Sequence, residues 1–431
     1  MSRWRCVMAL VVGCDAVSVD VSPRRDAAAE EVAAPPPLDL DAEVGLGATE
    51  PEAPDGADEP CNFRDDDGDG EVDEGTAYEM EAAVDLLENR ALGVPIEFRS
   101  IARGDDRILG VIQDGFWATN SGLRVFLSDF DGVTRAERRL SPQRHQPSRA
   151  FPLWVGGAFT VVGQQRPIGC PTSGACRTFG WRIASDGSEL WGGIREAPAV
   201  RQDMGGPVVL GDTIWVPFSR GRDDGGEELR AAPLDVGGRW GDEVVLHTVG
   251  LGGRFRPVRG VAFDDRIVWV YGTGAHQLEM VAMNAAGTVL ARPVVLSPQG
   301  QLIEDAPSSV ERMGDAMVVL FVVPDRGVMW GRWSLEGARL SGPTLVTRSG
   351  ARHALAVGHG QVIVVSSTFS DSGLALRRYA PDGRSLQAPT RTSDAGHTHS
   401  VVATDQGFVY LAGIYATPGR VVRSRIRCPT R

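Results

Sequence analysis

The sequence predicts an all-β fold assembled from a repeat of roughly fifty residues, and two series of turns support this prediction. The first series contains Gly115, Gly157, Asp212, Asp265, Asp315, Gly360 and Gly407, and the second contains Gly132, Gly187, Gly238, Gly287, Gly337 and Gly383. Both series keep a similar spacing, and each turn lies between runs rich in Val, Ile and Trp, which is typical of β-hairpins. Four short strands per repeat at this period predict a β-propeller.

The number of turns predicts seven blades, with a ring that spans residues 94–429. Seven first turns but six second turns indicate that the last blade lacks one strand of its own. We expect the N-terminal strand Val94–Ala102 to fill that place, because closing the ring removes an exposed sheet edge. Six blades, or a sandwich of two sheets, are the alternatives.

Composition and charge exclude several functions. The chain has 431 residues and a formal net charge of −12, and all 44 basic residues are arginine. Without lysine, neither a Schiff-base lysine nor a P-loop lysine is available. The segment Asp15–Gly75 is strongly acidic, whereas the chain from Thr76 onward is close to neutral, so no nucleic-acid partner is expected.

The N-terminus predicts export and attachment to a membrane. Arg3 and Arg5 precede a short apolar run that ends in Val11-Val12-Gly13-Cys14, which looks like a bacterial lipobox. Residues 1–14 would be a lipoprotein signal peptide with Cys14 as the lipidated residue; an ordinary signal peptide cut nearby is the alternative. Residues 15–60, rich in Ala, Pro, Glu and Asp, predict a disordered acidic tether. The protein would belong to the cell envelope, either periplasmic or exposed at the surface.

The stretch 61–76, which contains "CNFRDDDGDGEVDEG", predicts a metal-binding loop. Its oxygen ligands would come from six side chains: Asp65, Asp67, Asp69, Glu71, Asp73 and Glu74. Gly70 falls where a calcium loop turns and Val72 where it needs an apolar anchor, although position 12 is Thr76 and not the usual glutamate. An all-oxygen ligand set favours a hard cation, so we expect structural Ca²⁺. A solvated acidic linker is the alternative.

Within this stretch the D-x-D-x-D-G-x-x-D-E pattern resembles the thrombospondin type 3 repeat. It also resembles the Asp-rich, MopE-type metal-binding motif of exported lipoproteins from myxobacteria and their relatives. The resemblance covers Glu59–Gly75 and departs from the motif at Phe63-Arg64 and Gly68. It implies an exported protein with a metal site, and copper has been associated with the wider motif family.

Two further features complete the N-terminal region. Residues 77–93 predict a short helix, because Thr76 and Glu79 form a capping box ahead of apolar residues on one helical face; a strand around Ala83 to Leu87 is the alternative. Four cysteines remain after export and predict two disulfides, for which three pairings exist. We expect Cys170 with Cys176 as a local pair and Cys61 with Cys428 near the two ends of the body.

The centre of the ring is the expected binding region. His145, His353, His399, Arg259 and Arg352 fall just before or within predicted innermost strands, which line the central channel of a propeller. These positions permit a metal or anion site there, but no ligand spacing recurs, which favours satisfied or solvent-facing histidines instead. The sequence contains no nucleophile elbow, HExxH motif, P-loop or Rossmann fingerprint. We expect a monomeric binding module for a protein or glycan. The alternative is a propeller hydrolase or oxidoreductase with its site in the channel. A third hypothesis is a structural component of the cell envelope.

Overall fold

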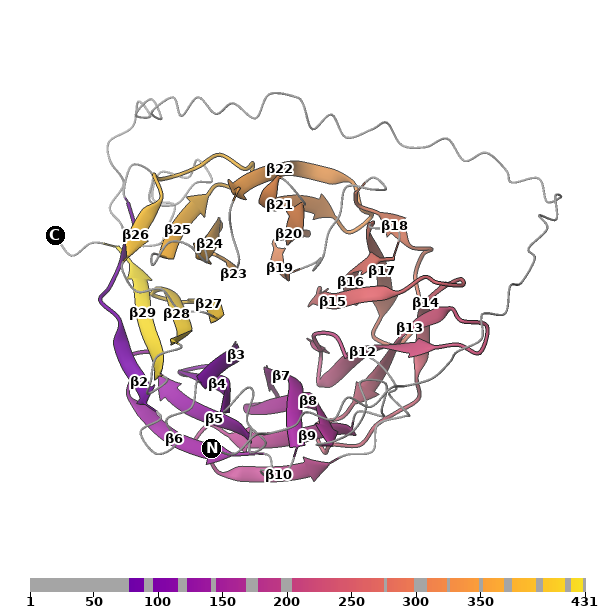
Figure 1. The fold of residues 1–431 in the computed structure, drawn as a ribbon, viewed down its shortest axis with the longest axis horizontal. Coiled ribbons are helices and arrows are strands. Elements are labelled where there is room, and N and C mark those ends of the chain that lie inside the picture. The colour runs from indigo at the N-terminus through magenta and orange to yellow at the C-terminus, as the bar shows by residue number, and fades with distance from the viewer. Residues whose placement is uncertain are drawn as a thin grey trace, which may run out of the picture. The chain divides into compact units, whose positions relative to one another are not determined.

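The computed structural model is a seven-bladed β-propeller, and it describes thirteen stretches of the chain. These are residues 77–88, 96–114, 122–140, 145–167, 177–194, 204–274, 277–297, 308–323, 326–348, 352–367, 374–392, 398–414 and 420–428. All the regular elements in these stretches are strands, arranged as seven antiparallel sheets around a ring (Figure 1). The prediction of an all-β propeller with seven blades is confirmed. The described residues contain no helix long and apolar enough to cross a membrane.

Blades 1 to 6 each have four strands, ordered from the centre outward as they occur in the chain. Blade 1 has β3 (Ile96–Arg103), β4 (Arg107–Asp114), β5 (Gly122–Asp129) and β6 (Thr134–Arg139). Blade 2 has β7 (His145–Val155), β8 (Ala158–Pro167), β9 (Arg177–Ala184) and β10 (Glu189–Ile194). Blade 3 has β11 (Val208–Leu210), β12 (Thr213–Gly221), β13 (Glu227–Leu234) and β14 (Val244–Val249).

The same order continues around the ring. Blade 4 has β15 (Phe255–Ala262), β16 (Arg266–Thr273), β17 (Leu278–Asn284) and β18 (Val294–Val295). Blade 5 has β19 (Ser309–Met313), β20 (Ala316–Val323), β21 (Gly327–Ser334) and β22 (Arg339–Thr347). Blade 6 has β23 (Arg352–Gly358), β24 (Gln361–Ser367), β25 (Leu374–Tyr379) and β26 (Thr390–Thr392).

Blade 7 joins the two ends of the chain. Its inner strands are β27 (Thr398–Thr404), β28 (Gly407–Ile414) and β29 (Arg420–Arg427), and its outer edge is β1 (Glu79–Met80) with β2 (Val84–Glu88). Both N-terminal strands pair antiparallel with β29. The ring is therefore closed by N-terminal strands, as predicted, but by different ones.

The predicted closing strand Val94–Ala102 was wrong. Residues from Ile96 onward form β3, the innermost strand of blade 1, which pairs with β4. The prediction fails because the first turn of blade 1 lies elsewhere than expected. The structure places this turn at Gly104–Arg107, where the Gly104 amide donates to the Arg107 carbonyl over 2.7 Å. Gly115, the turn expected from the sequence, lies outside the described residues.

The helix predicted over 77–93 was also wrong for the described part of that range, which contains β1 and β2. Tyr78 and Leu86 are buried, at 1% and 8% exposure. Tyr78 packs in the core between blades 6 and 7, and Leu86 in the core between blades 7 and 1. Pairing with β29 and burial in these two cores outweigh the helical capping signal. The propeller therefore starts well before residue 94.

The six predicted second turns connect the third and fourth strands of blades 1 to 6. Their glycines all have positive φ angles between 81° and 100°. In each turn the glycine amide donates to the carbonyl three residues earlier, for example Gly287 to Asn284 over 3.0 Å. Blade 7 has no such turn because its fourth strand comes from the N-terminus, which explains the count of six.

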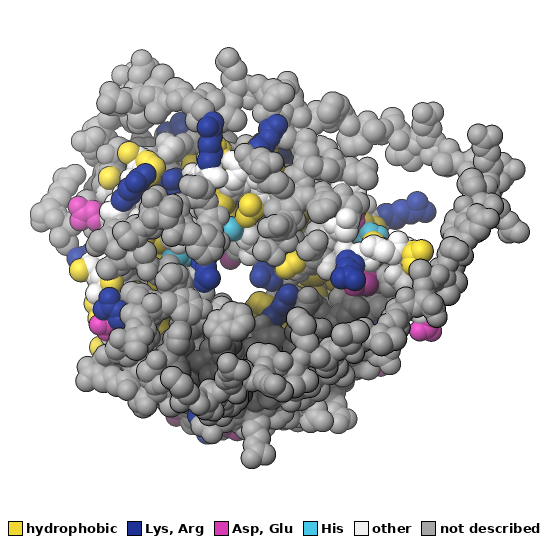
Figure 2. Space-filling model, in the orientation of Figure 1, with side chains coloured by type: hydrophobic (Ala, Val, Ile, Leu, Met, Phe, Trp, Pro, Cys, Tyr) yellow, Lys and Arg dark blue, Asp and Glu magenta, His cyan; other side chains and the backbone are white. Residues whose placement is uncertain are grey.

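Cores lie between neighbouring blades rather than in the centre of the ring. Each of the seven blade interfaces has its own cluster of buried apolar side chains in the described structure. Because all blades share one strand order, their innermost strands begin at one face of the ring and end at the other. We call these the entry face and the turn face, the latter containing the tight turns between first and second strands. The space-filling view shows a gap at the centre of the ring (Figure 2).

Candidate functional site

Most residues of the predicted lipidation, metal and disulfide sites lie outside the described residues. This holds for Cys14, Cys61, Cys170 and Cys176, and for the loop ligands Asp65, Asp67, Asp69, Glu71, Asp73 and Glu74. Lipidation, calcium binding and the disulfide pairing therefore stay predictions. Cys428 is described: it follows β29 at the turn face and packs against the core between blades 6 and 7.

All five residues predicted near the channel lie on innermost strands. His145 begins β7, Arg259 lies in β15, Arg352 and His353 begin β23, and His399 is the second residue of β27. Arg352, His353 and His399 lie on the neighbouring blades 6 and 7, whereas His145 lies on blade 2. No group of three metal-ligating side chains forms among the described residues, so nothing there supports a channel metal site.

The innermost strands have a marked excess of positive charge. They contain seven arginines and two glutamates, listed here in chain order: Glu97, Arg99, Arg103, Arg149, Arg256, Arg259, Glu311, Arg312 and Arg352. Figure 2 shows arginine side chains around the central opening of the ring. An excess of charge of one sign raises the local concentration of oppositely charged ligands. The inner ring is therefore suited to anions.

Two of these arginines are held by backbone carbonyl groups. Arg149 donates to the Met204 carbonyl over 2.6 Å, while the Met204 amide donates to Gln164 Oε1 over 3.1 Å. Arg259 donates to the carbonyls of Val258 and Ser308, over 3.2 and 3.4 Å. Backbone carbonyls thus orient both guanidinium groups, and an arginine oriented in this way loses little conformational entropy when it binds a carboxylate.

Phe151 lies beside Arg259 in the inner ring. The Arg259 guanidinium lies 5.6 Å from the centre of the Phe151 ring, and both side chains are partly exposed. A Cβ atom at Gly206 would lie 3.4 Å from Arg259 Cδ and 3.8 Å from the Phe151 ring, so this glycine provides room for the pair. We call Arg149, Phe151 and Arg259 the arginine wall.

Glu311 is one of the two acidic residues on the innermost strands. It lies on the same side of β19 as Met313, which packs in the core between blades 5 and 6. No hydrogen bond or ion pair to its carboxyl is found among the described residues. Burial raises the pKa of Glu311 to about 7.

His399 is the centre of a second cluster, at the entry face between blades 6 and 7. Its Nε2 lies 2.6 Å from Ser367 Oγ at the end of β24, and its Nδ1 lies 2.6 Å from the Tyr410 hydroxyl on β28. Ser367 and Tyr410 are 5% and 2% exposed, whereas His399 is partly exposed. The sequence predicted the histidine but neither of its partners.

A third polar cluster lies between blades 3 and 4. His247 Nδ1 is 2.8 Å from the Tyr271 hydroxyl and 3.5 Å from Glu279 Oε2. Burial raises the pKa of Tyr271 and of Glu279, and lowers the pKa of His247. Each shift favours the neutral form, which suits a buried group that joins two blades.

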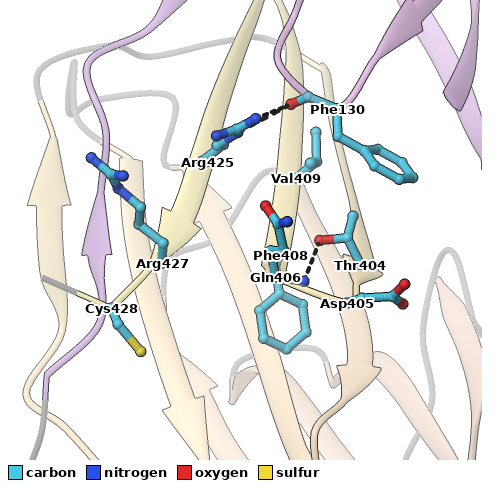
Figure 3. A pocket seen from close by; sticks show the side chains of 9 residues that line it. All are labelled: Phe130, Thr404, Asp405, Gln406, Phe408, Val409, Arg425, Arg427 and Cys428. Carbon is cyan, nitrogen blue, oxygen red and sulfur yellow. Dashed lines mark hydrogen bonds between the residues drawn. The ribbon is translucent and has the colours of Figure 1, made fainter. Parts of the chain in front are cut away.

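A pocket of about 270 Å³ lies at the turn face, on the seam between blades 7 and 1. Figure 3 shows Arg425 reaching the Phe130 carbonyl, to which its Nε and Nη2 donate over 3.1 and 3.0 Å. Arg427 pairs with Glu81 over 2.6 Å, and Asp405 pairs with Arg103. Because these charged groups already join the two ends of the ring, we attribute the pocket to ring closure.

No family model matches the sequence, and no curated protein matches it. Several solved structures resemble the fold. Phage phi92 endosialidase is 10% identical, with 84% of this chain and 70% of that chain covered and a TM-score of 0.49. Raptor from Chaetomium thermophilum is 10% identical, with 83% and 29% covered and a TM-score of 0.50. The WD40 domain of SCAP from fission yeast is 8% identical, with 82% and 98% covered and a TM-score of 0.45.

Likeness at such identities shows the fold alone. The chain is a seven-bladed β-propeller protein with an arginine-rich inner ring. Its activity has to be argued from its own residues.

Proposed function

We propose that this protein is a cell-envelope lipoprotein whose propeller is a binding module for an anionic protein or glycan. The observation that supports the binding function is the inner ring, in which arginines outnumber glutamates by seven to two. The ligand would contact this ring from the entry face.

The arginine wall indicates the ligand chemistry. A guanidinium group binds a carboxylate through two parallel hydrogen bonds, which favours carboxylate-bearing ligands over neutral ones. Phe151 offers an apolar face beside Arg259 for the carbon skeleton of a sugar ring or a side chain. An arginine wall with an aromatic residue favours binding, whereas converging carboxylates would have favoured an enzyme.

The place where the N-terminal segment joins the ring is consistent with a ligand at the entry face. β1 pairs with the last residues of β29, so the N-terminal segment joins the ring at the turn face, beside Cys428. In the proposal, Cys14 is lipidated, residues 15–60 are the tether, and the loop of residues 61–76 binds Ca²⁺ where the tether meets the ring. The entry face then lies opposite the point of attachment and is left open to a ligand.

Calorimetry with two polyanions, polygalacturonate and poly-glutamate, tests the binding function. We expect at least one of them to bind at low salt, neutral dextran not to bind, and affinity to fall as salt rises. Arg149→Ala and Arg259→Ala should each weaken binding about tenfold, the effect of losing about 1.4 kcal/mol. Arg266→Ala is the matched control, because Arg266 pairs with Asp265 at the turn face. Equal binding of dextran, or wild-type affinity in both wall variants, would contradict the proposal.

Mass spectrometry of the mature protein tests the anchor. We expect the N-terminal peptide to begin at an acylated Cys14, and Cys14→Ala to release the protein from the membrane fraction. A mature N-terminus elsewhere would refute lipidation while leaving the binding function untouched.

A further inference from the structure

The cluster at the entry face between blades 6 and 7 has the geometry of an activated nucleophile. A hydroxyl group is a weak nucleophile unless a neighbouring base takes its proton, and the base acts best when a third group orients it. Ser367, His399 and Tyr410 form this chain through two contacts of 2.6 Å each. The three residues come from three different strands of two blades, so the contacts do not follow from local sequence.

We propose that Ser367 is the nucleophile of an acyl-transfer site, with His399 as its general base. This activity is separate from the proposed binding function and rests on its own geometry. In the reactive state His399 Nδ1–H donates to the Tyr410 oxygen, which leaves Nε2 to accept the proton of Ser367. Tyr410 positions the imidazole, and its ring is stacked on that of His399 with centroids 5.7 Å apart.

The reaction is the hydrolysis of an ester by water. Ser367 Oγ forms a bond to the ester carbonyl carbon as its proton moves to His399 Nε2. The tetrahedral intermediate then breaks its bond to the alcohol oxygen, and His399 returns the proton to that oxygen. Water attacks the acyl-serine with His399 as base again, which releases a carboxylic acid and restores Ser367.

The surroundings limit the substrate. Ser367 is 5% exposed, so a short acyl group such as acetyl fits the site better than a bulky one. Arg352 is the residue paired with Ser367 across β23 and β24, and a guanidinium there favours negative charge developing on the acyl oxygen. The substrate class is therefore a short-chain acyl ester.

Ser366 provides a matched control within the same strand. Its Oγ accepts a hydrogen bond from Arg377 Nη1 over 2.8 Å, and successive residues of a strand point to opposite faces. Ser366 therefore has a similar burial and the same chemistry, but a different partner.

The test uses a small fluorophosphonate, followed by intact mass and peptide mapping, together with hydrolysis of p-nitrophenyl acetate. We expect one adduct per chain, located at Ser367, and hydrolysis above the rate in buffer. Ser367→Ala should abolish both. His399→Ala should slow labelling about 100-fold or more, the usual contribution of a general base. Ser366→Ala should label within about twofold of wild type.

Tyr410→Phe tests the positioning role. It should keep Ser367 reactive while shifting the pH at which the labelling rate is half-maximal, because the imidazole loses an oriented partner. Absence of an adduct on the folded wild type, an adduct mapped to another residue, or wild-type labelling of His399→Ala would each overturn the proposal. Mapping on the wild type decides the question even if a variant does not fold.

Discussion

Glu311 gives a pH-dependent prediction that can be worked out from the structure. Its carboxyl lies on the innermost strand of blade 5 without a hydrogen bond or ion pair among the described residues. Burial raises its pKa from an ordinary value of 4.5 to about 7. The folded protein therefore holds this proton more tightly than the unfolded chain does.

The sign and size of the effect follow from this difference. Below pH 4.5 both states are protonated, and Glu311 contributes no penalty. As the pH rises from 4.5 to 7 the unfolded chain releases the proton first, so the folded state is progressively disfavoured. At about 1.36 kcal/mol per pKa unit, the wild type loses up to about 3 kcal/mol over this window, an upper limit because the Glu311 side chain is partly exposed. Glu311→Gln keeps the size of the side chain and does not titrate, so it should avoid this loss.

Urea denaturation of wild type and Glu311→Gln at pH 4.5 and pH 8 measures the effect. The advantage of the variant should be larger at pH 8 by up to about 3 kcal/mol, or up to about 4 °C in Tm for a ring of this size. Glu336→Gln is the control, because Glu336 is exposed in the turn between β21 and β22 of the same blade. If the two variants show the same pH dependence, Glu311 is solvated and the reasoning about its burial fails.

Three further predictions concern the ring and its attachment. Tyr78→Ala should lower the free energy of unfolding by about 3–5 kcal/mol in urea melts, because the ring is buried 3.8 Å from the Arg378 guanidinium; a cost below 1 kcal/mol would show that this segment does not fasten the ring. Gly287→Ala should cost about 1–2 kcal/mol, since its φ is +81°, whereas Gly250→Ala, with nothing within 4 Å of the added Cβ, should cost less in the same assay. Chelation should lower Tm modestly if the loop of residues 61–76 binds calcium, and an unchanged melt together with no calcium by calorimetry would refute that site.

The periodic part of the fold could be predicted from sequence because its turns require particular residues. The glycines of the second turns adopt positive φ, which side chains other than glycine rarely accept, so they recur at each blade. The first turns are less restricted: blade 1 turns at Gly104–Arg107 and blade 4 at Phe263–Arg266, with the same hydrogen bond between different residues. Because of this freedom, the sequence predicts the first turn at Gly115 and assigns the residues of β3 to ring closure.

The closing segment and the site partners could not be predicted because distant residues determine them. Tyr78 and Leu86 become strand residues through burial in two inter-blade cores, which local helix signals do not report. Ser367 meets His399 only because the end of β24 lies beside the start of β27 in the next blade. Contacts of this kind depend on how two neighbouring sheets are placed against each other. Ser367 and His399 are 32 residues apart in the chain, and this spacing corresponds to no known motif.

Ring closure and the proposed acyl-transfer site depend on one core. Tyr78 of the closing segment and Tyr410 of the site both pack in the cluster between blades 6 and 7. Tyr410 orients His399 through its hydroxyl, so its position depends on how firmly that cluster is packed. The Tyr78 amide also donates to Gln387 Oε1 over 2.9 Å, which connects the closing segment to blade 6, the blade that provides Ser367. A change that loosens the N-terminal segment should therefore disturb the Ser367–His399 contact before it disturbs the arginine wall on blades 2 and 4.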